Sequence, residues 1–121
     1  MSIRIGINGF GRIGRLALRA CLEKYNDIEV VGINDLMDAE YMAYLLQYDS
    51  THGQFDGQID IADDRLIVNG HIIQVTQYSK PEDCLWDALD CEIVIESTGL
   101  FTTKEKAQGH ITAGAKKVIV S

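Results

Sequence analysis

The chain has 121 residues, of which 46% are apolar and 24% charged, with a formal net charge of −7. This length suits one compact domain, and the apolar fraction excludes a disordered chain. The negative charge argues against a nucleic-acid module, which needs cations to neutralise phosphates. No apolar run approaches the ~20 residues of a membrane span, and the N-terminal run lacks the features of a signal peptide. We therefore expect no nucleic-acid partner, no membrane partner and a cytoplasmic location.

Three cysteines and three histidines are scattered along the chain. Cys21, Cys84 and Cys91 are an odd number without a Cys-x-x-Cys pair, and no Cys/His spacing resembles a zinc site. A free cysteine behaves as a small hydrophobe. We expect buried free thiols, no disulfide and no metal site.

The N-terminal segment predicts a strand, a helix and a second strand. Isoleucines alternate with other residues over 3–7, and β-branched residues are frequent over 28–34. Between these runs, apolar residues recur at helical spacing. We expect that helix to bury a face made of Ile13, Leu16, Ala17, Ala20 and Cys21. The two strands should be parallel, with a right-handed crossover.

The middle of the chain predicts a helix followed by short strands. Asp38 is a candidate N-cap for a helix that buries Met42, Leu45 and Leu46. Strand-like runs follow at 58–62, 65–68 and 71–76. Asn69-Gly70 favours a tight hairpin, because both central residues of a type I′ turn need positive φ. We expect these runs to form an antiparallel excursion from the parallel sheet.

The last third predicts two helices and two further parallel strands. Pro81 suits the first turn of a short helix that buries Leu85, Ala88 and Leu89. Residues 92–96 and 117–121 are the strand candidates. Thr102 and Glu105 match a capping box, and the helix that they open should end at Gly114.

A glycine pattern joins the first strand to the first helix. Gly9, Gly11 and Gly14 form G-x-G-x-x-G, and Asp35 stands at the end of the second strand, about twenty residues further on. In this pattern the first glycine allows a tight turn, the second lets a pyrophosphate approach the backbone, and the third lets the helix pack on the strand. The diphosphate would bind free N–H groups of the first helical turn, at the positive end of the helix dipole.

Asp35 indicates which dinucleotide this pattern favours. Its carboxylate can accept hydrogen bonds from ribose hydroxyls and would repel a 2′-phosphate, so NAD is favoured over NADP. The alternative is a glycine turn that binds nothing, with Asp35 as a solvated strand end. We predict an α/β fold: a Rossmann-type doubly wound parallel sheet with an antiparallel hairpin insertion. Its cleft should lie at the carboxyl ends of the strands that end near Ile7, Asn34, Glu96 and Val120.

Longer motifs resemble the opening of the phosphorylating glyceraldehyde-3-phosphate dehydrogenases. The string INGFGRIGR at 7–15 is the most specific of them. Others lie at 32–35, 45–55, 68–70, 96–107 and 114–121. The resemblance implies an NAD site made of Asn8, Gly9, Gly11, Arg12, Ile13, Asp35, Thr98, Gly99, Phe101 and Ser121.

The resemblance also implies a role for each of these residues. The first five line the pyrophosphate, with Ile13 also near the nicotinamide, and Asp35 holds the adenosine ribose. Thr98, Gly99 and Phe101 follow the adenine and the centre of the cofactor, and Ser121 lies near the nicotinamide end. The loop at 77–80 should pass the adenine edge, but it departs from the family's usual Arg-Asp-Pro and is left out of the predicted site.

The family's catalytic segment does not occur in these 121 residues. In the family, a cysteine of a Ser-Cys-Thr-Thr-Asn-Cys motif attacks the aldehyde, hydride passes to NAD, and phosphate releases the acyl group. Neither this motif nor its partner histidine is found here, and none of the three cysteines matches the nucleophile. We interpret 1–121 as an NAD-binding domain that ends before the last strand of its sheet and lacks the catalytic domain. It should bind cofactor without catalysing on its own.

Two alternatives stay open. Erythrose-4-phosphate dehydrogenases share the INGFGRIGR motif but tend to have glutamate where this chain has Asp35. A free-standing, non-catalytic nucleotide-binding module also fits a chain without the catalytic residues. The family resemblance implies a tetramer for full-length members. An unpaired edge strand at 117–121 would also favour self-association of this chain.

Overall fold

The computed structural model describes residues 3–24, 27–48, 57–99 and 104–120. In chain order the elements are β1 (Ile3–Asn8), α1 (Arg12–Lys24), β2 (Ile28–Asn34), α2 (Ala39–Gln47), β3 (Ile59–Ala62), β4 (Arg65–Val68), β5 (His71–Thr76), the 3₁₀ turn η1 (Pro81–Asp83), β6 (Ile93–Glu96), α3 (Lys104–Thr112) and β7 (Lys117–Val120). None of the described helices is long and apolar enough to cross a membrane.

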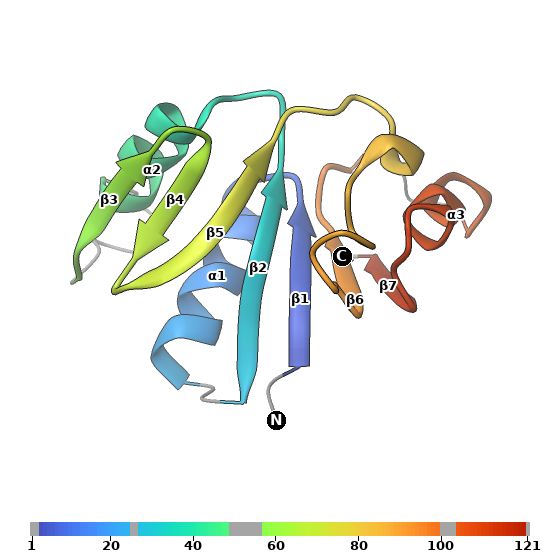
Figure 1. The fold of residues 1–121 in the computed structure, drawn as a ribbon, viewed down its shortest axis with the longest axis horizontal. Helices are drawn as coiled ribbons and strands as arrows, with labels where there is room; N and C mark the ends of the chain where they lie inside the picture. Colours follow the sequence, from blue (N-terminus) through green and yellow to red (C-terminus); the bar gives the residue numbers. More distant parts are fainter. Residues whose placement is uncertain (1–2, 25–26, 49–56, 100–103, 121) are drawn as a thin grey trace.

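The strands form one sheet in the order β3-β4-β5-β2-β1-β6-β7 (Figure 1). From β5 to β7 every neighbouring pair is parallel, while β4 is antiparallel to both of its neighbours. The chain moves outward from β1 in one direction through β2 and in the other through β6. The order therefore reverses between β1 and β6, which confirms the predicted doubly wound fold.

The hairpin region differs from its prediction in one respect. Asn69 and Gly70 have φ of 50° and 85°, as a type I′ turn requires, and they join β4 to β5. However, β5 also pairs with β2 in parallel, through residues 74–76. The run at 71–76 is thus a strand of the parallel sheet, and only β4 runs against it.

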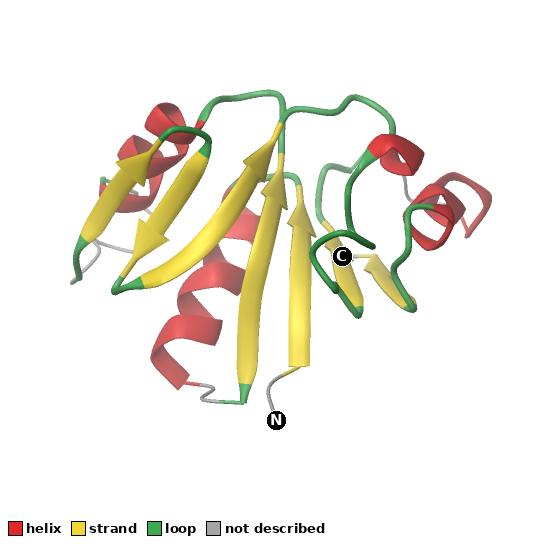
Figure 2. Ribbon diagram, in the orientation of Figure 1, coloured by secondary structure: helices red, strands yellow, loops and turns green. Residues whose placement is uncertain are grey.

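Two apolar clusters cover the two faces of the sheet. The helices α1 and α2 lie behind the sheet in Figure 2 and contribute Leu18, Met42 and Leu46 to the larger cluster. The smaller cluster includes Cys84, Trp86 and Cys91. The Trp86 ring lies against Gly6, where an added Cβ would come within 2.4 Å of it, so the small residue in β1 makes room for the indole.

The predicted apolar face of α1 is correct at Ala17 and Cys21, which pack against the core, but wrong at its first two residues. Ile13 and Leu16 are 51% and 47% exposed, whereas Leu18 is fully buried. The helix packs closely on the strand through Gly14, whose added Cβ would meet the Gly9 carbonyl oxygen at 2.2 Å. The buried face is therefore centred on Gly14 and Leu18.

The predicted helix after Pro81 is also wrong beyond its first turn. The 3₁₀ turn stops at Asp83, and residues 86–90 form turns instead. Leu85 is 47% exposed, while Trp86 is buried at 1%. The Trp86 side chain, which lies between Gly6 of the sheet and His110 of α3, thus takes the place of the expected apolar helix face.

The end of α3 agrees with its prediction. Gly114 has φ of 116°, its amide donates to the Ile111 carbonyl, and the Ala115 amide donates to the His110 carbonyl. This is a Schellman arrangement. The capping residue Thr102 lies outside the described residues. β7 lies at an edge of the sheet, where Ile119 and Val120 remain 50% and 40% exposed.

Candidate functional site

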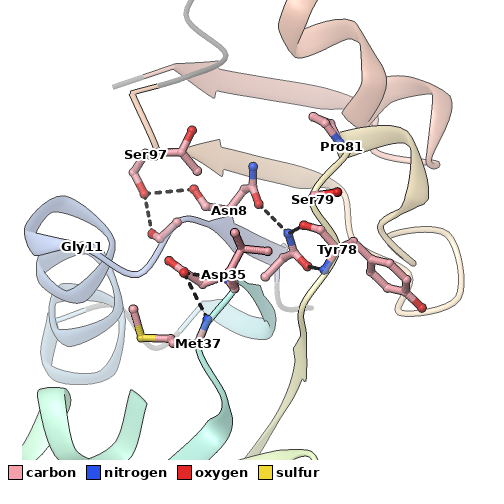
Figure 3. Close-up of a pocket in the computed structure, with 12 residues that line it drawn as sticks. Asn8, Gly11, Asp35, Met37, Tyr78, Ser79, Pro81 and Ser97 are labelled. Carbon is pink, nitrogen blue, oxygen red and sulfur yellow. Dashed lines mark hydrogen bonds between the residues drawn. The ribbon is translucent and has the colours of Figure 1, made fainter. Parts of the chain in front are cut away.

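A cleft of about 460 Å³ lies at the carboxyl ends of the parallel strands (Figure 3). Its size is within the range of small-molecule sites. The lining residues come from the ends of β1, β2 and β6 and from the loop after β5: Asn8, Gly9, Gly11, Asn34, Asp35, Leu36, Met37, Tyr78, Ser79, Pro81, Ser97 and Thr98. The cleft is therefore at the predicted switch point, although Val120 is not among its lining residues.

The glycine loop forms the floor of this cleft. Gly9 has φ of 98°, and an added Cβ would come within 2.8 Å of the Thr98 amide nitrogen. At Gly11, in contrast, an added Cβ would meet no protein atom within 4 Å. Because Gly11 lines the cleft, a side chain there would occupy the space that a ligand needs.

The N-terminus of α1 opens beside the same glycine. The helix begins at Arg12, its first turn contains no acidic residue, and the Arg15 amide donates to the Gly11 carbonyl at 2.9 Å. The Arg15 guanidinium donates to the Phe10 carbonyl at 3.0 Å. A helix terminus with free N–H groups and adjacent cations favours an anion.

Asp35 joins the second strand to the glycine loop. One carboxylate oxygen accepts from the Phe10 amide at 2.6 Å, and the other accepts from the amides of Leu36 at 2.6 Å and Met37 at 3.4 Å. Asp35 is half-buried and lines the cleft. Its carboxylate thus holds the loop in place and keeps oxygen lone pairs directed at the cleft, where ribose hydroxyls can donate.

The structure brings together five of the ten predicted site residues. Asn8, Gly9, Gly11, Asp35 and Thr98 line the cleft. Arg12, Ile13 and Gly99 are exposed and are not among its lining residues. Phe101 and Ser121 lie outside the described residues.

Asn8 lines the cleft but has its side chain directed elsewhere. The residue is 3% exposed, its amide nitrogen donates to Glu96 at 2.6 Å, and its amide oxygen accepts from Asn34 at 2.8 Å. Contact with a diphosphate would therefore use the Asn8 backbone.

One wall of the cleft is the loop that the family resemblance placed at the adenine edge but that was left out of the predicted site. Asn34 accepts from the Tyr78 amide and donates to the Tyr78 carbonyl, each at 2.9 Å, which holds the loop after β5 against the end of β2 (Figure 3). Tyr78, Ser79 and Pro81 form this wall. The loop was left out because its residues depart from the family's usual Arg-Asp-Pro, although it follows a strand that pairs in parallel with β2.

The three thiols lie outside the cleft lining and are poor nucleophiles. Burial, with smaller contributions from nearby carboxylates, raises the pKa of Cys84 to about 12. Burial likewise raises the pKa of Cys91 to about 12, against opposing backbone hydrogen bonds, and raises the pKa of Cys21. A nucleophilic cysteine needs the opposite shift, because the thiolate is the reactive form.

Comparison with known proteins agrees with this geometry. Residues 3–104 match the family model described as glyceraldehyde 3-phosphate dehydrogenase, NAD binding domain. The chain belongs to this family. Its relatives include glyceraldehyde-3-phosphate dehydrogenases of Salmonella typhimurium (57% identical) and Haemophilus influenzae (58%) and glyceraldehyde-3-phosphate dehydrogenase A of Escherichia coli (57%), each aligned over all 121 residues. The chain spans about a third of the length of these relatives, 36%, 35% and 36% respectively.

NAD is the cofactor of this glyceraldehyde 3-phosphate dehydrogenase domain. The residues present fit it, because the open space at Gly11 borders a helix N-terminus without acidic side chains. The Asp35 carboxylate, which would oppose a 2′-phosphate, stands beside them. The domain thus provides a site for a dinucleotide, while its three thiols are unsuited to covalent catalysis.

Proposed function

We propose that this domain holds NAD for the oxidative phosphorylation of glyceraldehyde 3-phosphate to 1,3-bisphosphoglycerate. The observation that carries the proposal is that α1 begins, without an acidic residue in its first turn, directly after Gly11, and that Gly11 and Asp35 line one cleft. Bound NAD supplies the hydride acceptor of that reaction. The chain's own residues bind and orient the cofactor, and the catalytic cysteine and histidine are not among residues 1–121.

We propose the residue roles that the family resemblance implies, five of which fall on residues that line the cleft. The backbone of Asn8, Gly9 and Gly11, with the first-turn amides of Arg12 and Ile13, would receive the diphosphate. Asp35 would accept from the adenosine ribose hydroxyls. Thr98, Gly99 and Phe101 would follow the adenine and the centre of the cofactor, and Ser121 would lie near the nicotinamide. Ile13 would also approach the nicotinamide from α1.

Calorimetric titration of NAD and NADP into the 121-residue chain tests this function. We expect NAD to bind and NADP to bind at least tenfold more weakly, because Asp35 places a negative charge where the 2′-phosphate would lie. Equal affinities for the two cofactors would contradict the role of Asp35. A chain that binds neither would contradict the proposed function itself.

We further propose that the chain does not catalyse the reaction alone. With aldehyde, NAD and phosphate supplied, NADH formation should stay at the background rate. The raised pKa values of Cys84 and Cys91 support this expectation. Thiol titration with an aromatic disulfide at pH 8 should give slow reaction in the folded chain and fast reaction in urea. Turnover that disappears when one of the cysteines is replaced would contradict the proposal.

We also propose that the chain associates with itself and is located in the cytoplasm. The edge strand β7 supports self-association, because exposed apolar edge strands pair with other chains. Sedimentation over a concentration series should therefore yield species larger than the monomer. A monodisperse monomer at every concentration would contradict this part of the proposal alone.

A further inference from the structure

A line of buried polar side chains passes beneath the cofactor cleft. It crosses the sheet from the loop after β5, through the ends of β2, β1 and β6, to α3. Its buried members are Asn34 and Asn8 at 3% exposure, Glu96 at 2% and His110 at 0%. Buried polar groups of this kind are costly unless they are hydrogen-bonded, so the partners of each atom define what the line does.

On the β2 side, a backbone amide determines which side-chain atoms are donors and which are acceptors. The Tyr78 N–H can only donate, and it donates to the Asn34 side-chain oxygen. The Asn34 nitrogen therefore donates to the Asn8 oxygen at 2.8 Å. The Asn8 nitrogen in turn donates to Glu96 Oε1 at 2.6 Å. These three hydrogen bonds, from Tyr78 through Asn34 and Asn8, all donate in the direction of Glu96.

On the α3 side, the indole N–H of Trp86 determines which nitrogen of His110 is the donor. Trp86 Nε1–H can only donate, and it donates to His110 Nδ1 at 2.9 Å. His110 Nδ1 thus carries no proton, and the imidazole is neutral. Its Nε2–H donates to Glu96 Oε1 at 2.7 Å, which makes this side also point toward Glu96. The Asn8 nitrogen lies 3.4 Å from the same Nε2, as expected for two donors that share one acceptor.

Glu96 holds a wall of the cleft with its other oxygen. Glu96 Oε2 accepts from the Thr98 amide at 3.0 Å and from the Thr98 hydroxyl at 2.6 Å. Four donors from the described part of the chain thus converge on its two oxygens, an arrangement that suits an ionised carboxylate. Burial alone raises the pKa of Glu96, but the hydrogen bonds from His110, Thr98 and Asn8 outweigh it and lower the pKa from its usual value.

We propose that Glu96 is a positioning residue for the cofactor, which it does not itself line. As the shared acceptor of both halves of the network, it fixes Thr98 on one wall of the cleft and, through Asn8 and Asn34, Tyr78 on the opposite wall. The distance between the two walls is thereby set by one buried carboxylate. This inference rests on NAD binding in the cleft described above.

Glu96→Gln tests the proposal because glutamine keeps the shape of the side chain. Its amide nitrogen cannot accept hydrogen bonds, so one pair of donors loses its acceptor whichever way the amide turns. We expect NAD to bind at least tenfold more weakly by calorimetry. Without NAD, the backbone amide resonances of Thr98 and Tyr78 should both move in a ¹H–¹⁵N spectrum, although they lie on opposite walls.

Val94→Ala is the matched control for a general loss of stability. Val94 lies two residues earlier in β6, is fully buried, and does not line the cleft. Urea unfolding of both variants shows whether they are folded and similarly destabilised. We expect Val94→Ala to bind NAD within twofold of the unchanged chain and to leave the Thr98 and Tyr78 resonances in place. Equal losses of affinity in the two variants would overturn the proposal.

The unchanged chain provides a test that needs no variant. The chain contains one tryptophan, so the indole N–H of Trp86 gives a single resonance, and Trp86 does not line the cleft. Contact of NAD with Thr98 should shift that resonance through Glu96 and His110. NAD binding without such a shift would overturn the proposal even if Glu96→Gln does not fold. A chain that does not bind NAD at all would instead remove the proposed function.

Discussion

Two helices of this domain begin in opposite ways. At α2, the Asp38 side chain accepts from the Tyr41 amide at 2.8 Å, and Glu40 adds a second acid to the first turn. At α1, Gly11 precedes the helix, and the first turn contains no acid. Both helices follow strands of the same parallel sheet, so the difference lies in the residues before and within the first turn.

The difference separates a helix end whose amide donates to a protein side chain from one that, on the proposed function, the diphosphate of NAD would satisfy. A side-chain N-cap such as Asp38 typically contributes ~0.5–2 kcal/mol, a stabilisation that α1 forgoes. The first turn of α1 follows Gly11, which lines the cleft, and it contains Arg12 and Arg15. An anionic ligand there supplies the missing acceptor. The uncapped helix is therefore the better indicator of function.

Gly11→Asp removes this difference by giving α1 the capping residue that α2 has. The carboxylate would accept from the first-turn amides and repel the diphosphate, and Gly11 does not have a positive φ that would disfavour the substitution. We expect NAD affinity to fall at least ~100-fold, about 2.7 kcal/mol, as calorimetry can measure. Thermal stability should rise, because a new cap stabilises a helix by roughly 1 kcal/mol.

Gly11→Ala is the control for this variant. It adds a Cβ in open space but no charge and no acceptor. Its loss of NAD affinity should be clearly smaller than that of Gly11→Asp. Equal losses would assign the effect to volume in the cleft and leave the open helix end without a role.

Asp35→Asn sharpens the comparison by removing the charge of the acidic residue that lines the cleft. Asparagine retains an oxygen that can accept from Phe10 or Leu36, so the glycine loop should stay in place. We expect the preference for NAD over NADP to fall about tenfold, since the charge that opposes the 2′-phosphate is lost. Calorimetry with both cofactors measures the ratio. An unchanged ratio would show that the charge of Asp35 does not select the cofactor.

Salt tests whether charge contributes to binding at the open end of α1. Raising NaCl from 0.05 to 0.5 M should weaken NAD binding about threefold, because interactions with partly exposed charges and helix dipoles are screened. Adenosine is the matched ligand without phosphate, and its affinity should be insensitive to the same change. If salt weakens the binding of both ligands equally, the helix end does not contribute to binding of the diphosphate.

The sequence was sufficient to predict the elements whose signals are local. The glycine pattern, the turn at Asn69-Gly70 and the helix end at Gly114 each depend on a few neighbouring residues, and each is confirmed. The orientation of the α1 face was not predicted, because apolar side chains were weighed above Gly14. The close contact of Gly14 with the strand could have corrected it, since that contact requires the glycine to be buried.

The missed parts of the site depend on contacts between distant segments. Trp86, His110 and Glu96 come from three elements, and nothing in their spacing indicates that they meet. The wall at Tyr78 was left out of the predicted site because its residues depart from the family motif, whereas its position depends on the pairing of β5 with β2. Local patterns predict the glycine loop that is proposed to bind the diphosphate, whereas the side chains that support it are identified only from the tertiary structure.

Asp38→Ala completes the comparison from the other helix and should have the smallest effect on the cofactor. The Tyr41 amide loses its acceptor, so the free energy of unfolding should fall by ~1 kcal/mol, as urea unfolding can measure. Asp38 does not line the cleft, and NAD affinity should therefore stay within twofold. Gly11→Asp would then raise stability and weaken NAD binding strongly, while Asp38→Ala would lower stability and leave NAD binding nearly unchanged. A marked loss of NAD affinity in Asp38→Ala would mean that α2 and the cleft are coupled, and that the two helix ends do not have separate roles.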